Sequence, residues 1–359
     1  MRSILLNPGP VSLSDGVRKA AVRSDYCHRE PEYFEVQASV RKSLLDIYSC
    51  TASDWTSVLL GGSGTTALEA MLASMLPRDA RLLVLENGVY GERISKIAGI
   101  HGIDHEVVKH GWMEAIDIDQ VDNALAGGAF SHLAAVHHET TTGRLNDVHA
   151  LAALCERHRV KLLLDTVSSF GAEAIPFESD ALIGSAATAN KCLHGIPGLC
   201  MVVCRRAALN LAPIPSRSLY LDLSLWLDQQ DRNSTPFTPP VNSLLALSEA
   251  LRELASAGGW KARHARYLKL IARVDRALRK YGVEMMLPAT DYSCVLHSYR
   301  VPDSLDYFRI HDGLKQRGFV IYAGQGKLAE QMFRISTMGD ISDYDMERLL
   351  AALHEVFVS

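Results

Sequence analysis

Two short apolar segments in the middle of the chain each lead into a charged residue. Residues 161–164 predict a buried strand that ends at Asp165, and residues 180–187 predict a second strand that leads into Lys191. Both charged side chains would then lie in loops that leave strand ends. In open parallel sheets, that edge is where ligands bind. The pattern therefore predicts a ligand site that contains a carboxylate and a lysine.

The chemistry of these two side chains points to one kind of ligand. A buried aspartate keeps its charge only beside a cation, and a buried lysine tends to lose its proton. Pyridoxal phosphate needs both, because its ring nitrogen pairs with a carboxylate and its aldehyde condenses with a neutral amine. An aspartate at a helix start and an exposed lysine would give the same local pattern, so the other loops have to decide between the two interpretations.

The composition excludes several classes of protein. The 359 residues are 22% charged with a formal net charge of −4, which gives no overall attraction to nucleic acid or anionic membranes. Basic residues between positions 261 and 280 follow helical spacing and predict a solvated helix face. No apolar run is long enough for a membrane span, and residues 1–6 lack the apolar core of a signal peptide. Seven cysteines without paired spacing indicate reduced thiols, so we expect a cytoplasmic protein.

The order of the predicted elements indicates an α/β fold. Residues 55–205 alternate short apolar strands with amphipathic helices, which is typical of a mostly parallel sheet covered on both faces. The C-terminal part alternates differently, with a first strand expected over 292–299, and predicts a small α+β domain. We expect an N-terminal segment near the active site (residues 1–15), a large domain with a linking helix (16–257) and the small domain (258–359).

A glycine-rich turn follows the first convincing buried strand, residues 55–60. The sequence GGSGTTALEA runs from this turn into a helix whose free backbone N–H groups would suit a phosphate. The same residues satisfy a looser dinucleotide pattern, with Gly62, Gly64 and Ala67 at the required spacing and Glu86 about 20 residues on. A nicotinamide-dependent dehydrogenase is therefore an alternative, and a purely structural turn is another.

Other loops carry further candidate residues. Tyr90 would lie at the same sheet edge, where its ring could stack on a flat ligand, and the threonines at 140–142 offer hydroxyl groups. The turn Asn-Pro-Gly-Pro brings the backbone at Gly9 close to a ligand. Arg334 lies on a predicted strand among apolar neighbours, which suggests a fixed anchor for a carboxylate or phosphonate. Surface packing, turn capping and solvent exposure are the plainer explanations.

With these pieces placed, the chain resembles the class V branch of the fold-type-I pyridoxal-phosphate enzymes over nearly its full length. The stretches that carry the resemblance include LLNPGPV, GGSGTTALEA, HHETTTGRLN, LLLDTVSSFGA, SAATANKCLHGIPG, PFTPPVN and FRISTMGD. Together they are very specific for the superfamily. They distinguish substrates less well, since alanine–glyoxylate and serine–pyruvate aminotransferases share much of the same set.

The resemblance implies a role for each matching residue. Lys191 would form the Schiff base with the cofactor and move the proton, and Asp165 would pair with the pyridine nitrogen. The other cofactor contacts it implies are Ser63, Gly64, Thr65, Tyr90, Thr140 or Thr141, Ser168, Asn190 and Thr238 of a partner subunit. A shared Thr238 implies a homodimer. Arg334 would bind the carboxylate of an amino or keto acid, with Gly9 and Arg29 as further substrate contacts.

The reaction that the resemblance implies is a ping-pong transamination between an amino donor and a keto acid. Members that use 2-aminoethylphosphonate and pyruvate, and so form phosphonoacetaldehyde and alanine, are the most similar. Transamination of alanine or serine with glyoxylate or pyruvate is the alternative. This chain reads DYCHREPEYF where family members carry a Trp-containing pattern, and His28 and Arg29 there could bind the same anionic group or a different one.

Overall fold

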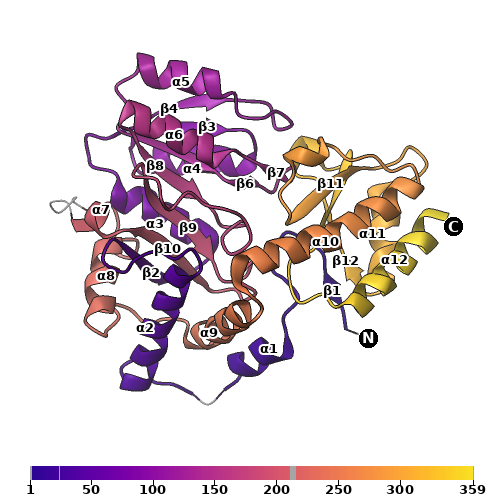
Figure 1. The fold of residues 1–359 in the computed structure, drawn as a ribbon, viewed down its shortest axis with the longest axis horizontal. Coiled ribbons are helices and arrows are strands. Elements are labelled where there is room, and N and C mark those ends of the chain that lie inside the picture. The colour runs from indigo at the N-terminus through magenta and orange to yellow at the C-terminus, as the bar shows by residue number, and fades with distance from the viewer. Residues whose placement is uncertain (1, 24, 211–215, 359) are drawn as a thin grey trace.

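The computed structural model describes residues 2–23, 25–210 and 216–358, which form a larger α/β part and a smaller part beside it (Figure 1). Helix α10 (Gly259–Lys280) leads from the large part to the small one, and strand β1 (Ile4–Leu5) lies with the small part. The chain therefore begins beside the small part and then enters the large one. The predicted domain boundaries at residues 15 and 257 stay predictions.

The central sheet is built from strands that are apolar along most of their length. Across the sheet, the described strands follow the order β2 (Trp55–Gly61), β10 (Leu199–Arg205), β9 (Leu182–Thr188), β8 (Lys161–Asp165), β5 (His132–Val136), β3 (Arg81–Glu86) and β4 (Asp104–Lys109). Strand β10 runs antiparallel to both of its neighbours, and the other pairs are parallel. The predicted α/β fold with a mostly parallel sheet is confirmed.

Helices cover both faces of this sheet because alternate strand residues enter separate hydrophobic cores. Leu162 and Leu164 enter one core, and Leu163 enters the other. The first face is covered by α2 (Pro31–Asp46), α5 (Ile118–Gly127), α6 (Val148–His158) and α9 (Val241–Ser256). The second is covered by α3 (Gly64–Met75), α4 (Val89–Ile100), α7 (Arg206–Asn210) and α8 (Leu223–Asp231). None of the described helices is long and apolar enough to cross a membrane.

The small part has a core of its own. Its sheet has the order β11 (Leu296–Arg300), β14 (Met332–Ser336) and β13 (Tyr322–Ala323), and β1 pairs in parallel with β12 (Phe319–Val320). Helices α10, α11 (Tyr307–Gln316) and α12 (Asp343–Val358) pack against these strands, whereas α1 (Asp15–Ala21) packs on α9. Ile4 and Leu6 are fully buried in the small core, so the start of the chain helps to build it.

The structure differs from the sequence-based expectation in three places. Strand β4 lies at the sheet edge and is largely exposed, so its sequence DHEVVK has no apolar run. The apolar pattern therefore does not predict this strand. Helix α5 is likewise not predicted. A strand expected over 292–299 begins only at Leu296, because the amide of Cys294 donates to the Glu173 carboxylate.

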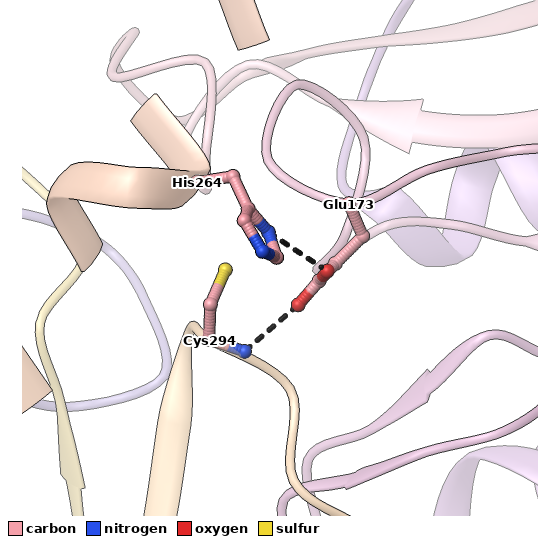
Figure 2. A group of neighbouring side chains, drawn as sticks. All are labelled: Glu173, His264 and Cys294. Atoms are coloured by element: carbon pink, nitrogen blue, oxygen red, sulfur yellow. Dashed lines mark hydrogen bonds and ion pairs between the residues drawn. The ribbon is translucent and has the colours of Figure 1, made fainter. Parts of the chain in front are cut away.

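That buried carboxylate joins the two parts of the molecule (Figure 2). Glu173 lies in the loop after β8, accepts from Cys294 N at 2.8 Å and pairs with Nδ1 of His264 on α10 at 3.2 Å. Ser293 Oγ also donates to it. The ligand-type atoms of Glu173, His264 and Cys294 lie within 4.8 Å of one another, but protein donors already satisfy the carboxylate. We interpret the group as a structural junction.

The junction predicts a pH-dependent contribution to stability. Burial alone would raise the pKa of Glu173, but donors led by His264 and Ser293 lower it to about 2, and the same bond raises the pKa of His264. The pair therefore contributes its full stabilisation at pH values above the pKa of an unfolded glutamate and below that of an unfolded histidine. This stabilisation is lost as the pH rises through the raised pKa of His264. We expect His264→Ala to lower Tm by about 2 °C at pH 6, because the pair is partly screened by solvent.

Thermal unfolding of wild type and variant at pH 6 and pH 9 checks this expectation. The deficit of the variant should shrink at pH 9, where the wild-type histidine is neutral. An equal deficit at both pH values would show that the imidazole contributes by packing and not by charge.

Candidate active site

Asp165 and Lys191 lie at the carboxyl ends of two neighbouring strands. Asp165 is the last residue of β8 and is 5% exposed, and Lys191 follows β9 and is partly buried. The carboxylate Oδ1 accepts from Val167 N at 2.9 Å, while the backbone carbonyl of Asp165 accepts from His137 N at 2.9 Å. The parallel pairing of β8 with β9 thus brings together the two residues that the sequence singles out.

Burial shifts the pKa values of Asp165 and Lys191 in opposite directions. It raises the pKa of Asp165 to about 6, opposed by the Val167 amide and by the charges of Arg93 and Lys191. It lowers the pKa of Lys191 to about 8, with Asp165 partly opposing and Arg334 and Arg93 adding to the shift. The site therefore holds a carboxylate that gains from a cationic partner and a lysine that can be neutral near physiological pH.

The N-terminal segment closes over the lysine. Lys191 Nζ donates to the carbonyl of Pro8. A Cβ atom at Gly9 would lie 2.6 Å from Cδ and 2.8 Å from Cε of the lysine, and Gly9 has a φ of +115°. Only glycine fits both the space and the backbone there. The Lys191 side chain therefore runs through space that a side chain at position 9 would occupy.

The start of α3 offers backbone donors at the same edge. Ser63 caps the helix in a reciprocal box with Thr66, and among the described residues the Gly64 and Thr65 amides have no protein acceptor. A Cβ at Gly64 would lie 2.6 Å from Cγ1 of Val167, so glycine lets this turn approach the loop after Asp165. The geometry suits an anion such as a phosphate.

Tyr90 lies in the first turn of α4 and is held on two sides. The guanidinium of Arg93 lies 4.6 Å from the centre of its ring, and Arg93 Nη1 also donates to Thr65 Oγ1 at 3.0 Å. The backbone N–H of Tyr90 donates to Glu139 Oε2 at 3.2 Å. The arginine thus links the phosphate-type turn to the aromatic ring.

The hairpin of β6 (His138–Glu139) and β7 (Arg144–Leu145) brings the threonines to this edge. Thr141 Oγ1 donates to Glu139 Oε1 at 2.6 Å and accepts from Val89 N at 3.1 Å, so its one proton is already committed within the protein. Thr140 and Thr141 are both buried. Of the two, Thr140 is the better candidate to donate a proton to a ligand.

Arg334 is 2% exposed and fixed by two carbonyl groups. Its Nε donates to Ala323 O at 2.9 Å and its Nη1 donates to Thr140 O at 2.7 Å. In the described part of the chain, Nη2 has no protein acceptor. Burial lowers the pKa of Arg334, but it stays charged. The side chain thus presents an oriented donor near Lys191, whose pKa it depresses.

The remaining predicted residues are placed less directly. Ser168 Oγ donates to His138 O at 3.0 Å, and Asn190 Oδ1 accepts from Thr188 Oγ1 at 2.8 Å, so both side chains have protein partners. Arg29 is exposed and donates to Thr235 O at 3.0 Å. Thr238 is exposed in the loop before α9. The structure does not bring Arg29 or Thr238 of this subunit into contact with Lys191, and the roles predicted for all four residues stay predictions.

Sequence reasoning missed two residues of the site. Arg93 stands three positions after Tyr90 on a helix, and that spacing could have identified it as a neighbour on the same face. Glu139 follows two adjacent histidines in HHETTTG, and its carboxylate accepts from Tyr90 N and from Thr141. No local signal indicates those partners.

The residues present fit pyridoxal phosphate. Asp165 Oδ2 has no protein donor among the described residues and can accept from a protonated ring nitrogen. The amides at the start of α3 can hold a phosphate, and Lys191 supplies an amine that burial makes easier to deprotonate.

The dinucleotide pattern is not supported by the topology. In a dinucleotide-binding unit, the glycine-rich turn and the following acidic residue lie on adjacent parallel strands. Here β2 and β3 are separated in the sheet by β10, β9, β8 and β5, so Glu86 does not lie beside the glycine turn. The dehydrogenase alternative is therefore wrong.

Comparisons with known proteins give a consistent result. The sequence model described as aminotransferase class-V matches residues 19–325. A protein of Phocaeicola vulgatus named 2-aminoethylphosphonate–pyruvate transaminase is 34% identical over 358 residues, covering 98% of both chains. A protein of the same name from Vibrio cholerae is 37% identical over 364 residues, covering 99% of this chain and 98% of its own. The solved structure of an aspartate aminotransferase from Thermus thermophilus superposes with a TM-score of 0.90 at 27% identity, covering 99% of both chains.

The close approach at Gly9 predicts a selective effect on the lysine. We expect Gly9→Ala to displace the Lys191 side chain and to slow the incorporation of pyridoxal phosphate at this residue by at least about tenfold, because a buried overlap costs about 1–3 kcal/mol. Borohydride reduction followed by peptide mapping measures the incorporation.

Gly102→Ala is the matched control. Gly102 also has a positive φ, of +60°, but no atom lies within 4 Å of the added Cβ. It should lose a little stability and label normally. Equal labelling of the two variants would contradict the steric role of Gly9.

Proposed function

Because the chain belongs to the class-V aminotransferase family, we propose that it transfers the amino group of 2-aminoethylphosphonate to pyruvate, giving phosphonoacetaldehyde and alanine. Relatives with that name match almost the entire chain, which supports the choice of substrates. The observation that carries the proposal is the arrangement of Lys191, Asp165 and Arg334, a buried amine and carboxylate beside an anchored guanidinium.

The family uses pyridoxal phosphate, and the residues of this chain suit it. Asp165 would hold the ring nitrogen, the turn of Ser63, Gly64 and Thr65 would hold the phosphate, and Tyr90 would stack on the ring. When bound, this cofactor withdraws electrons from the substrate carbon next to the nitrogen and so makes a proton there easier to remove.

The protein itself handles the proton and the orientation. Lys191, with its pKa lowered to about 8, is neutral in an appreciable fraction of molecules near neutral pH and can accept a proton at Nζ. Its contact with Pro8 O and the space at Gly9 guide that amine toward the edge of the sheet. Asp165, with a pKa of about 6, is charged at the same pH.

Arg334 would bind the anionic end of both substrates in turn. Carbonyl groups of Ala323 and Thr140 fix two of its nitrogens, so the remaining donor has a defined direction. A guanidinium pairs with either a carboxylate or a phosphonate. One pocket can therefore accept the amino donor and the keto acid in succession.

Because Arg334 can bind either kind of anion, the site also fits a second candidate function. Transamination of alanine or serine with glyoxylate or pyruvate would need only a carboxylate at Arg334. Arg29, which could add a second cation for a phosphonate, instead bonds to Thr235 O. The two functions differ in the amino donor that they require.

We also propose a cytoplasmic homodimer with shared sites. The exposed loop around Thr238 would extend to the phosphate site of the partner subunit. All seven cysteines are unpaired, as a reducing compartment requires.

A direct assay tests the donor. Protein loaded with pyridoxal phosphate should form alanine and phosphonoacetaldehyde from 2-aminoethylphosphonate and pyruvate, with a kcat/KM at least about tenfold above that for alanine or serine with glyoxylate. Amino-acid analysis and trapping of the aldehyde measure both products. Lys191→Ala serves as the control and should be inactive with every pair. Activity only with alanine or serine would replace the first proposal by the second.

The proposed role of Arg334 predicts that its substitution changes KM for both substrates. Arg334→Lys should raise KM for both the amino donor and the keto acid by about 10- to 100-fold, since a lysine cannot bond to two carbonyls and a substrate in the same geometry. The absorbance of the bound cofactor should be kept. Arg300→Lys, an exposed arginine on the adjacent β11, is the control. A change for only one substrate would mean that the two anions bind at different places.

A further inference from the structure

The carboxylate of Glu139 is held by donors from two elements. Tyr90 N at the start of α4 donates to Oε2 at 3.2 Å, and Thr141 N and Oγ1 donate to Oε1 at 3.0 and 2.6 Å. Val89 N in turn donates to Thr141 Oγ1 at 3.1 Å. The start of α4 is thus attached to the β6–β7 hairpin through two neighbouring amides.

The turn that follows Glu139 also holds Arg334. Gly143 N donates to Glu139 O at 2.8 Å and closes the turn, and Arg334 Nη1 donates to Thr140 O inside it at 2.7 Å. Tyr90 and Arg334 are therefore fixed to the same short turn, although they come from different parts of the fold.

Glu139 occupies space that a side chain at Gly88 would fill. It is fully buried, and a Cβ atom at Gly88 would overlap its carboxyl group. The φ of Gly88 is 174°, which any residue adopts, so the need for glycine there is steric. The absence of a side chain at 88 is what lets the carboxylate reach the amide of Tyr90.

We propose that Glu139, as a charged carboxylate, is a positioning residue that sets the ring of Tyr90 and the guanidinium of Arg334 relative to each other. The inference rests on the proposed function, in which these two side chains contact the cofactor and the substrate. Both carboxylate oxygens accept from N–H groups. A side-chain amide or a protonated carboxyl group carries hydrogen on one of its two polar atoms. Such a group cannot accept hydrogen bonds from the N–H donors at both ends.

The charges around Glu139 give this arrangement a pH dependence. Burial raises the pKa of Glu139 to about 7, the bonds from Thr141 and Tyr90 lower it, and Asp165 of β8 raises it further. Arg334 of β14 is the cation that interacts with it. Above about pH 7 the carboxylate accepts from all its donors, and below that pH the added proton opposes one of them.

The test is the affinity for pyridoxal phosphate, measured by equilibrium dialysis between pH 6 and 9 without any amino donor. We expect Glu139→Gln to weaken binding on the order of tenfold at pH 8, the usual effect of one unsatisfied buried donor. The wild type should lose affinity as the pH falls through 7, and the variant should lose less over the same interval. KM for the amino donor should rise as well.

Glu173→Gln is the matched control, because it removes another buried carboxylate with several donors but lies at the junction of the two parts. It should lose thermal stability and keep the wild-type affinity and pH dependence. The same affinity and pH dependence in Glu139→Gln as in wild type would overturn the proposal, as would an equal loss in Glu173→Gln.

Two further outcomes have a defined meaning. If Glu139→Gln does not fold, Thr141→Val removes the hydroxyl between Val89 N and Glu139, and unchanged binding of pyridoxal phosphate by that variant overturns the proposal. Wild-type protein that binds pyridoxal phosphate but does not react with 2-aminoethylphosphonate would contradict the proposed substrate and leave the binding test of Glu139 valid.

Discussion

The removal of water from Asp165 and Lys191 is the physical constraint on which the site depends. Burial disfavours charge on both groups, and so it raises one pKa to about 6 and lowers the other to about 8. A cationic ring nitrogen would offset the cost of burying the charged carboxylate, and a carbonyl group would react with the neutral amine. The parallel pairing of β8 and β9 maintains the two groups side by side.

Segments far apart in the sequence complete this pair. The N-terminal turn supplies Pro8 O and the space at Gly9, and the small part supplies Arg334. Ile4 and Leu6, which lie just before this turn, are buried in the core of the small part. The core of the small part and the surroundings of Lys191 therefore depend on each other. A shift of the small part against the sheet would move both the cover of the lysine and Arg334, the proposed substrate anchor.

Local sequence patterns predict elements and residue types, whereas hydrogen-bond partners depend on the fold. The apolar runs that end at Asp165 and near Lys191, and the glycine turn before α3, are local signals, and the structure has these elements where they were expected. The resemblance implies cofactor contacts for Ser168 and for Thr140 or Thr141, and these stay predictions. In the structure, the hydroxyl groups of Thr141 and Ser168 donate to Glu139 and to His138 O, buried acceptors that would compete with a ligand. Such an acceptor is close only after folding.

The sequence alone determined most strands and helices of the large part, but not the exposed β4 or helix α5, because apolar periodicity and glycine placement act within a few residues. It also predicted the residue types of a pyridoxal-phosphate site and, through its resemblance to known enzymes, identified the family. Only the tertiary structure decided that four strands separate β2 from β3, and that Glu139 accepts from the amide of Tyr90. Strand order and hydrogen-bond partners are set by the packing of the whole core, and no stretch of a few residues carries that information.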